Sequence, residues 1–435
     1  MEVSRLLDAI RSFRSAGSGI RDWSVMFSES RGLTLGIKDR EIGNPHAPLS
    51  LTESSRASYR LIWDDGLVSL GHLERRQLQG DPSEALEYAR MAAYDDPDAA
   101  WVRGPAPMPD VEMFDDAAAA LARGETGLLT DRLTTIHQRI AGRNFKTWSG
   151  SFSAGTGASR LVTSAGLDDS SNGTTAGWYV AVNGEAGDGF SARRPEPGDE
   201  FEARIDRLLE TAARLERPGP AMEAGARCVI LSPGVVDAYV LGTLLSNLAG
   251  SKVAHGEGHF RREQFGSGEP VLREDIDLRL DPLQPLRAGT YRCTSEGVPA
   301  SRCAYIESGR LVHPILGLKY ARRLGLEPTP LPWSSDTLYL GSPERVSLDK
   351  ALADASGGVL VLSVLGAHTQ DPASGDFSLS APQALSIEKG ALNGRLRGTI
   401  SGNLFEVLRS NDLRFVAFEG EHVPGLLLTC RFDPQ

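Results

Sequence analysis

The chain has 435 residues, of which 40% are hydrophobic and 24% are charged, and its formal net charge is −11. A chain of this length can form two or three domains with a large core. The acidic balance argues against general nucleic-acid binding, because phosphate contacts need clustered Lys and Arg.

Targeting and redox features point to the cytoplasm. The N-terminal residues lack a basic segment followed by an apolar core, so no signal peptide is expected. No apolar run approaches the roughly 20 residues that cross a bilayer. The four cysteines, Cys228, Cys293, Cys303 and Cys430, show no Cys-x-x-Cys spacing. We therefore expect a cytoplasmic protein with reduced thiols that binds neither a membrane nor nucleic acid.

The N-terminal half is predicted to alternate helices with strands. Leu6, Ile10 and Phe13 recur at helical spacing, which predicts an amphipathic opening helix. Asp81 followed by Pro82 is typical of a helix start. Further helices are predicted over 117–122, 129–140 and 201–215.

Strands are predicted between these helices. Asp65-Gly66 supplies the backbone angles of a tight hairpin turn between 59–63 and 67–70. Residues 40–56 contain Pro, Asn and Ser and indicate a loop. The other predicted strands cover 23–27, 33–38, 146–153, 160–164 and 175–182.

A linker divides the predicted domains. Pro218-Gly219-Pro220 interrupts the pattern and places the boundary between domains 1–222 and 223–435. After it we expect a strand and then a helix from Ser232-Pro233 to about residue 249, ended by Gly250. Short strands with Gly turns follow. The expected class is α+β, with an N-terminal α/β domain of helices on a mixed sheet and a C-terminal β-rich, barrel-like domain.

One short pattern occurs twice in the C-terminal half. Ile-Glu-x-Gly-x-Leu is found at 306–311 and at 387–392. Each copy predicts a hairpin with glycine at the turn. Two hairpins of one kind suggest a duplicated β-unit.

The stretch 366–380 is rich in Ser, Asp and Gly and also contains Thr, Gln and His. Its small and hydroxylated side chains would leave the backbone accessible, so that another extended chain could lie against it as an added strand. Composition alone favours a solvated turn cluster.

Four motifs carry a family resemblance. They are Glu-Gly-Val-Pro at 296–299 with the Ile-Glu hairpin after it at 306–311, Ser-Gly-Asp-Phe-Ser at 374–378, the second Ile-Glu hairpin at 387–392, and Gly-Thr-Ile-Ser-Gly-Asn-Leu at 398–404. Tyr-Ala-Arg at 320–322 follows the first hairpin. In this order, across roughly residues 225–410, the chain resembles the TldD/PmbA family, once called modulators of DNA gyrase.

The resemblance implies one of two subunit kinds. In the TldD kind a helix carries His-Glu-x-x-x-His, which together with a cysteine nearer the C-terminus holds zinc. The corresponding positions here are Gly242, Thr243 and Asn247. None of these residue types is a usual zinc ligand or general base. Cys430 lies in an apolar run that is typical of a core strand. The resemblance therefore implies the PmbA, or TldE, kind, with no catalytic residue, no metal ligand and no cofactor of its own.

The implied function belongs to a complex. A TldD-type partner would carry zinc, and the heterodimer would act as a metallopeptidase on amide bonds of unfolded peptides or peptide-derived natural products. The family cavity, enclosed by the two C-terminal domains, would be lined by 295–299 and 366–380. The residues expected to bind substrate are Glu296, Gly297, His368, Thr369, Ser374, Gly375, Asp376 and Phe377. Glu296 could equally accept hydrogen bonds that hold the turn after it.

Two further chemistries remain open. His255, Glu257 and His259 would form a metal pair with a carboxylate if they lay on a helix, but the intervening glycines favour a turn. Ser374 and His368 with Asp371 or Asp376 could form a hydrolase triad, although no Gly-x-Ser-x-Gly elbow is present.

Two rival functions accompany these readings. The chain could be a self-sufficient homodimeric amide hydrolase. It could also be a purely structural scaffold for the TldD-type partner.

Overall fold

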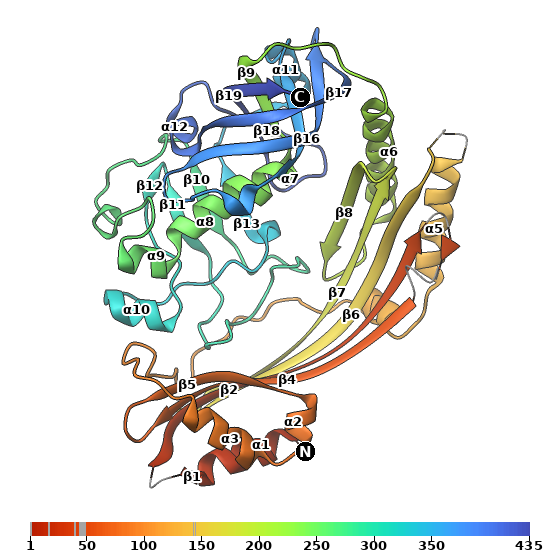
Figure 1. The fold of residues 1–435 in the computed structure, drawn as a ribbon. Helices are drawn as coiled ribbons and strands as arrows, with labels where there is room; N and C mark the ends of the chain where they lie inside the picture. Colours follow the sequence, from red (N-terminus) through yellow and green to blue (C-terminus); the bar gives the residue numbers. More distant parts are fainter. Residues whose placement is uncertain (1, 16–17, 39–40, 43–48, 142, 144) are drawn as a thin grey trace.

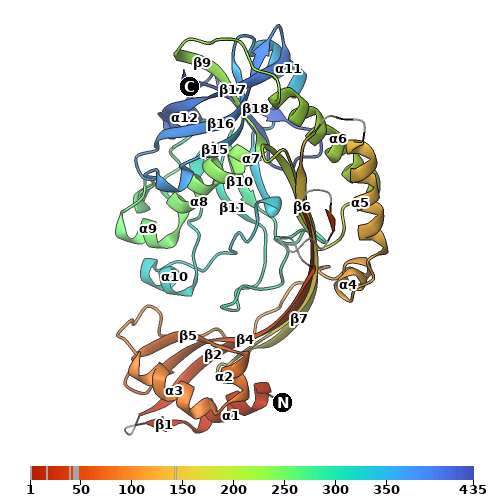
Figure 2. The same ribbon diagram turned by 45° about the vertical axis from the view of Figure 1, so that its right-hand side comes forward.

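The computed structural model describes residues 2–15, 18–38, 41–42, 49–141, 143 and 145–435. A long curved sheet from the N-terminal half arches beside a β-rich C-terminal unit (Figures 1 and 2). Within the described residues, no helix combines the length and the apolar character that crossing a membrane requires.

The N-terminal sheet has eight strands in the order β5-β4-β2-β6-β7-β8, with β1 and β3 also paired to β2. Its strands are β1 Arg14–Ser15, β2 Ser18–Lys38, β3 Glu41–Ile42, β4 Leu49–Trp63, β5 Val68–Glu74, β6 Trp148–Thr163, β7 Asp168–Val182 and β8 Ala186–Ala192. The predicted class of helices on a sheet is confirmed. The pairings are antiparallel rather than mixed, because tight hairpins join β4 to β5 and β6 to β7.

In two places, a pair of strands predicted separately forms one long strand. Residues 23–27 and 33–38 both belong to β2, and residues 146–153 and 160–164 fall largely within β6. The predicted loop 40–56 is also partly wrong. Residues 49–56 belong to β4, whereas 40 and 43–48 lie outside the described residues. Polar residues interrupt the apolar alternation in these stretches, but the backbone pairing continues through them.

Helices cover both ends of one face of this sheet. They are α1 Glu2–Ser12, α2 Arg75–Gln79, α3 Pro82–Met91, α4 Asp116–Ala122, α5 Gly127–Ile140 and α6 Gly198–Leu215. On β2, Val25 and Phe27 pack in the same core as α1 and α3, while Leu33 and Ile37 pack with α5 and α6. Residues 29–31 between them are exposed. The predicted helix start at Asp81 is confirmed, since its side chain accepts a hydrogen bond from Ser83 N.

The C-terminal unit contains a closed barrel, as predicted. Its five strands are β9 Gly225–Leu231, β15 Val359–Leu365, β16 Asp376–Glu388, β17 Ala391–Asn403 and β19 Gly425–Pro434. The ring closes because β19 pairs with both β17 and β9. The strands β14 Arg345–Ser347 and β18 Arg414–Ala417 extend this sheet. A separate four-stranded sheet contains β10 Asp277–Leu280, β11 Cys303–Glu307, β12 Arg310–Leu311 and β13 Leu338–Gly341.

The two Ile-Glu-x-Gly-x-Leu segments both form hairpins. Ser308 and Gly309 have φ of 48° and 70°, and Lys389 and Gly390 have φ of 51° and 78°. Positive φ at both central residues is the requirement of a two-residue hairpin turn. The hairpins lie in different sheets, however. The repeated pattern therefore reflects shared turn chemistry and does not mark a duplicated unit.

The helix predicted over 233–249 is segmented. It consists of α7 Pro233–Val235, a π-helical stretch Val236–Leu241 and α8 Gly242–Leu248, and α9 Gly250–His255 follows a bend at Ala249. The predicted helix end near residue 249 is confirmed, since α8 ends at Leu248, but Gly250 is not its cap because it begins α9. Glycine at this position lets α9 pack closely against Leu316, because a Cβ there would lie 2.7 Å from the Leu316 side chain. The remaining α-helices are α10 Leu318–Leu324, α11 Leu348–Asp354 and α12 Leu404–Arg409.

A buried ion cluster joins the two halves of the chain. Arg204 on α6 lies 3.1 Å from Glu196, 3.4 Å from Asp188 and 2.6 Å from Glu421 of the C-terminal unit. Arg204 is 8% exposed. Burial raises the pKa of all three carboxyl groups, and the guanidinium opposes that shift. Arg204 is therefore the cation that compensates one buried carboxylate, Glu196, and two half-buried ones, Asp188 and Glu421, at neutral pH.

We expect Arg204→Met to lower the free energy of unfolding by about 3 kcal/mol at pH 7, because buried carboxylates would lose their counterion. The loss should shrink toward pH 5. Carboxyl groups whose pKa is raised in the folded state stabilise it at low pH, and they lose that contribution as the pH rises through the folded pKa. Urea unfolding at both pH values measures this effect.

Arg139→Met is the matched control. Arg139 pairs with Glu202 and Asp206 on an exposed helix surface. Its loss should be below about 1 kcal/mol and nearly independent of pH. Equal losses for the two variants would contradict the role given to Arg204.

Candidate functional site

The side chain of Asn247 joins three segments at the predicted substrate loop. Its Nδ2 donates to Thr243 O at 2.9 Å and to Pro372 O at 2.7 Å, and its Oδ1 accepts from His259 N at 2.6 Å. Asn247 is 1% exposed. A buried amide with these partners fixes α8 against both the loop 366–375 and the segment after α9.

His259 reinforces the same loop. Its ring stacks on Phe405 with centroids 3.5 Å apart, and its Nδ1 lies 3.2 Å from Ala373 O. Arg409 Nη2 lies 3.2 Å from Nε2. A carbonyl only accepts and a guanidinium only donates, so this geometry fits a neutral imidazole protonated at Nδ1. Burial lowers the pKa of His259, which favours the same neutral form.

The predicted loop residues are mainly occupied with one another. Asn403 Nδ2 donates to Ser374 O at 3.0 Å and to Asp376 Oδ1 at 2.8 Å. Thr369 Oγ1 donates to Gly366 O at 2.8 Å. The stretch therefore includes the turn cluster that composition favoured.

The loop residues differ in accessibility. Gly375 has φ of 76°, and a Cβ there would lie 2.4 Å from Phe405. Phe377 is 7% exposed and packs edge-on against Tyr239 at 5.6 Å. Gly375 and Phe377 therefore support the loop from the core side. Of the predicted substrate-binding residues in this loop, His368, Thr369, Ser374 and Asp376 are exposed.

The hydrolase triad is not assembled in this geometry. Ser374 Oγ donates to Asp371 O at 3.2 Å and accepts from Asp376 N at 3.1 Å. Among the described residues, no hydrogen bond joins Ser374 to His368. The serine is part of the turn and is not activated by a base.

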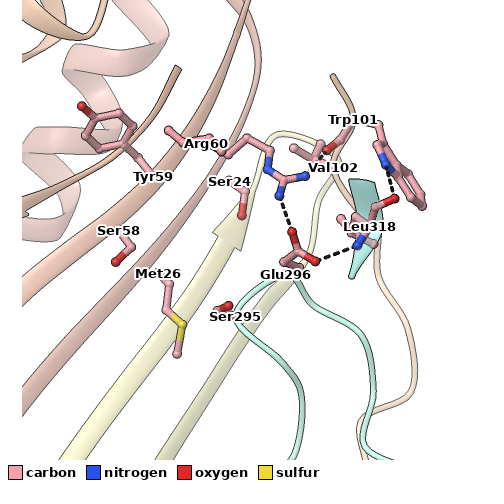
Figure 3. Close-up of a pocket in the computed structure, with 11 residues that line it drawn as sticks. Ser24, Met26, Ser58, Tyr59, Arg60, Trp101, Val102, Ser295, Glu296 and Leu318 are labelled. Atoms are coloured by element: carbon pink, nitrogen blue, oxygen red, sulfur yellow. Dashed lines mark hydrogen bonds and ion pairs between the residues drawn. The ribbon is translucent and has the colours of Figure 1, made fainter. Parts of the chain in front are cut away.

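Glu296 lies at the contact between the two halves of the chain, in a cavity of about 160 Å³ (Figure 3). Arg60 of β4 donates to Glu296 Oε1, and Leu318 N at the start of α10 donates to Oε2 at 2.7 Å. The side chains of Arg60 and Glu296 are mostly buried, at 12% and 22% exposed. Trp101 Nε1 adds a bond to Leu318 O at 3.2 Å.

The turn after Glu296 is held by a different residue. Thr294 Oγ1 accepts from Glu296 N at 3.3 Å and from Val298 N at 3.2 Å. Gly297 has φ of 80°, and a Cβ there would lie 2.6 Å from Leu167. Glu296 thus does not hold its own turn but ties α10 to the N-terminal sheet. No hydrogen bond in the described part of the chain links this segment to 366–380.

The residues at the family's zinc positions do not fit a zinc ion. Gly242 has no side chain, and the Asn247 amide is fully engaged. Burial raises the pKa of Cys430 to about 12, which keeps a protonated thiol. The described residues contain no group of three His, Cys, Asp or Glu side chains that could hold a metal.

The segment His255-Gly256-Glu257-Gly258-His259 is a turn, as its glycines predicted. Gly256 has φ of 67° and ends α9. His255 packs edge-on against Tyr320, and Glu257 pairs with Lys252 at 3.5 Å. His259 is directed instead to Phe405 and the loop. The two imidazoles therefore serve different contacts.

Comparison with known proteins agrees with this architecture. Residues 225–428 match the model of the PmbA/TldA metallopeptidase C-terminal domain. An uncharacterised protein of Methanocaldococcus jannaschii is 24% identical over 189 residues, which are 42% of this chain and 44% of that protein. A protein of Methanothermobacter thermautotrophicus named metalloprotease is 25% identical over 214 residues, covering 47% and 45%. The chain thus aligns with less than half the length of these curated relatives.

Three solved structures share the whole fold. A candidate DNA gyrase modulator from Thermotoga maritima has a TM-score of 0.79 at 19% identity, covering 99% of both chains. A second one, from Bacteroides thetaiotaomicron, has 0.78 at 17%, covering 100% of this chain and 97% of that one. TldE from Thermococcus kodakarensis has 0.76 at 18%, covering 100% and 99%.

The arching sheet and the five-stranded barrel define a two-part fold with a metallopeptidase-type C-terminal domain. The match of residues 225–428 to the PmbA/TldA model supports the TldD/PmbA resemblance that the four motifs indicated, and the whole chain shares the fold of the three solved structures.

We expect Asn247→Ala to lower the free energy of unfolding by about 2 to 4 kcal/mol, because buried partners at His259 N and Pro372 O would be left unsatisfied. Amide hydrogen exchange of residues 366–376 should also accelerate. Ser246→Ala on the same helix is the control and should change neither quantity measurably. Unchanged exchange in Asn247→Ala would show that the amide does not hold the loop.

A double-mutant cycle tests the tie between Glu296 and Arg60. We expect Arg60→Met and Glu296→Gln to show a coupling energy of about 1 to 2 kcal/mol in unfolding, because the charged pair is mostly buried. Gln retains an acceptor for Leu318 N. The exposed Arg160 and Asp168 pair should couple by less than about 1 kcal/mol. A coupling near zero would show that the pair does not tie the two halves together, and substrate binding would remain as the role of Glu296.

Proposed function

We propose that this chain is the TldE-type, zinc-free subunit of a heterodimeric TldD/TldE-type metallopeptidase. The complex would act in the cytoplasm on amide bonds of unfolded peptides or of peptide-derived natural products. Membership in a metallopeptidase-type family supports the reaction class. The single observation that carries the subunit assignment is Asn247, a buried structural amide at a position where the TldD kind has a zinc-binding histidine.

The electrostatic and chemical environment of α8 supports the same assignment. Zinc needs three good ligands and an open position. Gly242 and Thr243 supply no such ligand, and burial raises the pKa of the neighbouring Tyr239, so that its hydroxyl stays protonated. No base or metal ligand therefore lies on the helix that would carry them. Zinc and the hydrolytic chemistry would come from the TldD-type partner.

This chain would contribute a rigid wall for substrate. Asn247 and His259 hold the backbone of the loop 366–376 from two sides. Among the exposed side chains of that loop, those of His368 and Thr369 would contact an extended peptide, whereas Phe377 and Gly375 would support the loop from the core side. Glu296 would act by holding the N-terminal sheet against α10.

The test is amide hydrolysis by this chain alone, by a TldD-type subunit from the same genome alone, and by the coexpressed pair. We expect the lone chain to be inactive on an unfolded peptide and the pair to be active, with at least a tenfold gain over the partner alone. Full activity of this chain by itself would contradict the assignment and favour the self-sufficient hydrolase.

A loop variant separates a substrate wall from a pure scaffold. His368→Ala with Thr369→Ala should raise KM of the pair several-fold without changing the amount of pair that copurifies. Met91→Ala, at a residue 82% exposed on α3, is the control. Unchanged KM in the loop variant would leave this chain only a stabilising role.

A further inference from the structure

The hairpin of β11 and β12 opens just beyond β12. Val312 N donates to Tyr305 O at 2.9 Å, but in the described part of the chain no other backbone hydrogen bond joins β11 to residues 312–316. Pro314 has no N–H with which to continue the ladder. Ile315 is instead hydrogen-bonded at the junction of α8 and α9. The chain therefore turns away from β11 and leaves a space beside it.

The segment after α10 closes this space into a hollow. Thr329 N donates to Leu316 O at 3.0 Å, and Thr329 Oγ1 accepts from Leu316 N at 2.8 Å. The segment after α9 forms a further wall, and α9 and α10 lie side by side (Figures 1 and 2). The hollow has a volume of about 600 Å³. This is a typical size for a site that binds a small ligand or part of a peptide.

The interior of the hollow is mainly apolar. It is lined by Phe265, Val312, Pro314, Leu316 and Pro330, all of which are buried or half-buried. Leu326 extends this surface and is 49% exposed. Such a surface favours an apolar side chain of a ligand.

The exposed residues around the hollow carry mainly positive charge. They include Arg262, Arg302 and His313 but only one acidic residue, Glu327. Arg262 Nη2 donates to Leu324 O at 3.0 Å, and Arg302 Nε donates to Asp281 at 2.9 Å. Because a guanidinium has five N–H donors, both arginines keep donors for a ligand. An arginine fork matches a carboxylate in shape and charge.

We propose that this hollow binds the carboxyl end of an extended peptide, with the terminal carboxylate at Arg262 or Arg302 and an apolar side chain in the interior. Cys303 and Pro314 line the hollow from the two sides of the opened hairpin, and no described backbone hydrogen bond joins them. A peptide backbone can use the polar groups along such a gap. A free fatty acid has no backbone to offer there, so the geometry favours a peptide.

The proposal concerns binding by this chain alone. In the proposed heterodimer the bound end would belong to a substrate or to a cleavage product. Neither zinc nor a partner is needed to measure the binding, so this proposal and the proposed function can fail separately.

Calorimetric titration with two peptides tests the site. We expect acetyl-Gly-Ser-Leu-Leu with a free carboxylate to bind with a dissociation constant at least tenfold below that of the same peptide as an amide. Arg262→Met with Arg302→Met should raise the constant for the acid at least tenfold and leave that for the amide nearly unchanged. Arg75→Met with Arg76→Met, an exposed pair on α2, is the matched control and should change neither constant.

Cys303 reports whether the peptide occupies the hollow. Burial raises the pKa of both Cys303 and Cys293 to about 11, and only Cys303 lines the hollow. A saturating amount of the peptide acid should slow alkylation of Cys303 by iodoacetamide at least threefold and leave Cys293 unchanged, as measured by peptide mass mapping. Equal affinities for acid and amide, or unchanged alkylation of Cys303, would overturn the proposal. Binding of decanoate but not of the peptide acid would also overturn it and identify a site for free acids.

Discussion

The organisation of the candidate site depends on the hydrogen bonds of one buried amide. Asn247 holds the carbonyl of Pro372, the amide of His259 and its own helix together, and no water is needed to satisfy it. His259 then stacks on Phe405 and holds the next carbonyl of the loop. A loop rich in Ser, Asp and Gly would otherwise order poorly, because little apolar surface opposes its entropy. In this chain the helix supports the loop, and the proposed function assigns zinc chemistry at this helix to the partner subunit instead.

A second constraint sets the relation of the two halves. The apolar core of the N-terminal sheet, α5 and α6 includes Leu385 of β16, and two polar ties add to this contact. Arg204 brings α6 to Glu421 at one end, and Arg60 brings β4 to Glu296 near the other. The side chains of the two pairs are 10% to 33% exposed, and each carboxylate accepts from its arginine. These ties connect the arching sheet to the C-terminal unit beside it (Figure 2).

Local chemistry made part of this structure predictable. The turns at Gly309 and Gly390 followed from the need for positive φ, and the helix start at Asp81 followed from its cap. The length of β2 could not be predicted in this way, because polar residues in its middle break the burial pattern while backbone pairing continues. The partner of Glu296 was also hidden, since Arg60 lies 236 residues away. Asn247 was recognised as a position without zinc chemistry, but its bonds to Pro372 and His259 arise only from tertiary folding.

The proposed function requires that this chain holds no zinc and that a TldD-type partner does. The most direct measurement is the zinc content per protein, determined by elemental mass spectrometry, of the purified chain and of the coexpressed pair. The account predicts no stoichiometric zinc in the lone chain and one zinc per heterodimer, unchanged when His255 and His259 are replaced by Ala. One zinc per lone chain, lost on those replacements, would contradict it and make this chain a metalloenzyme in its own right.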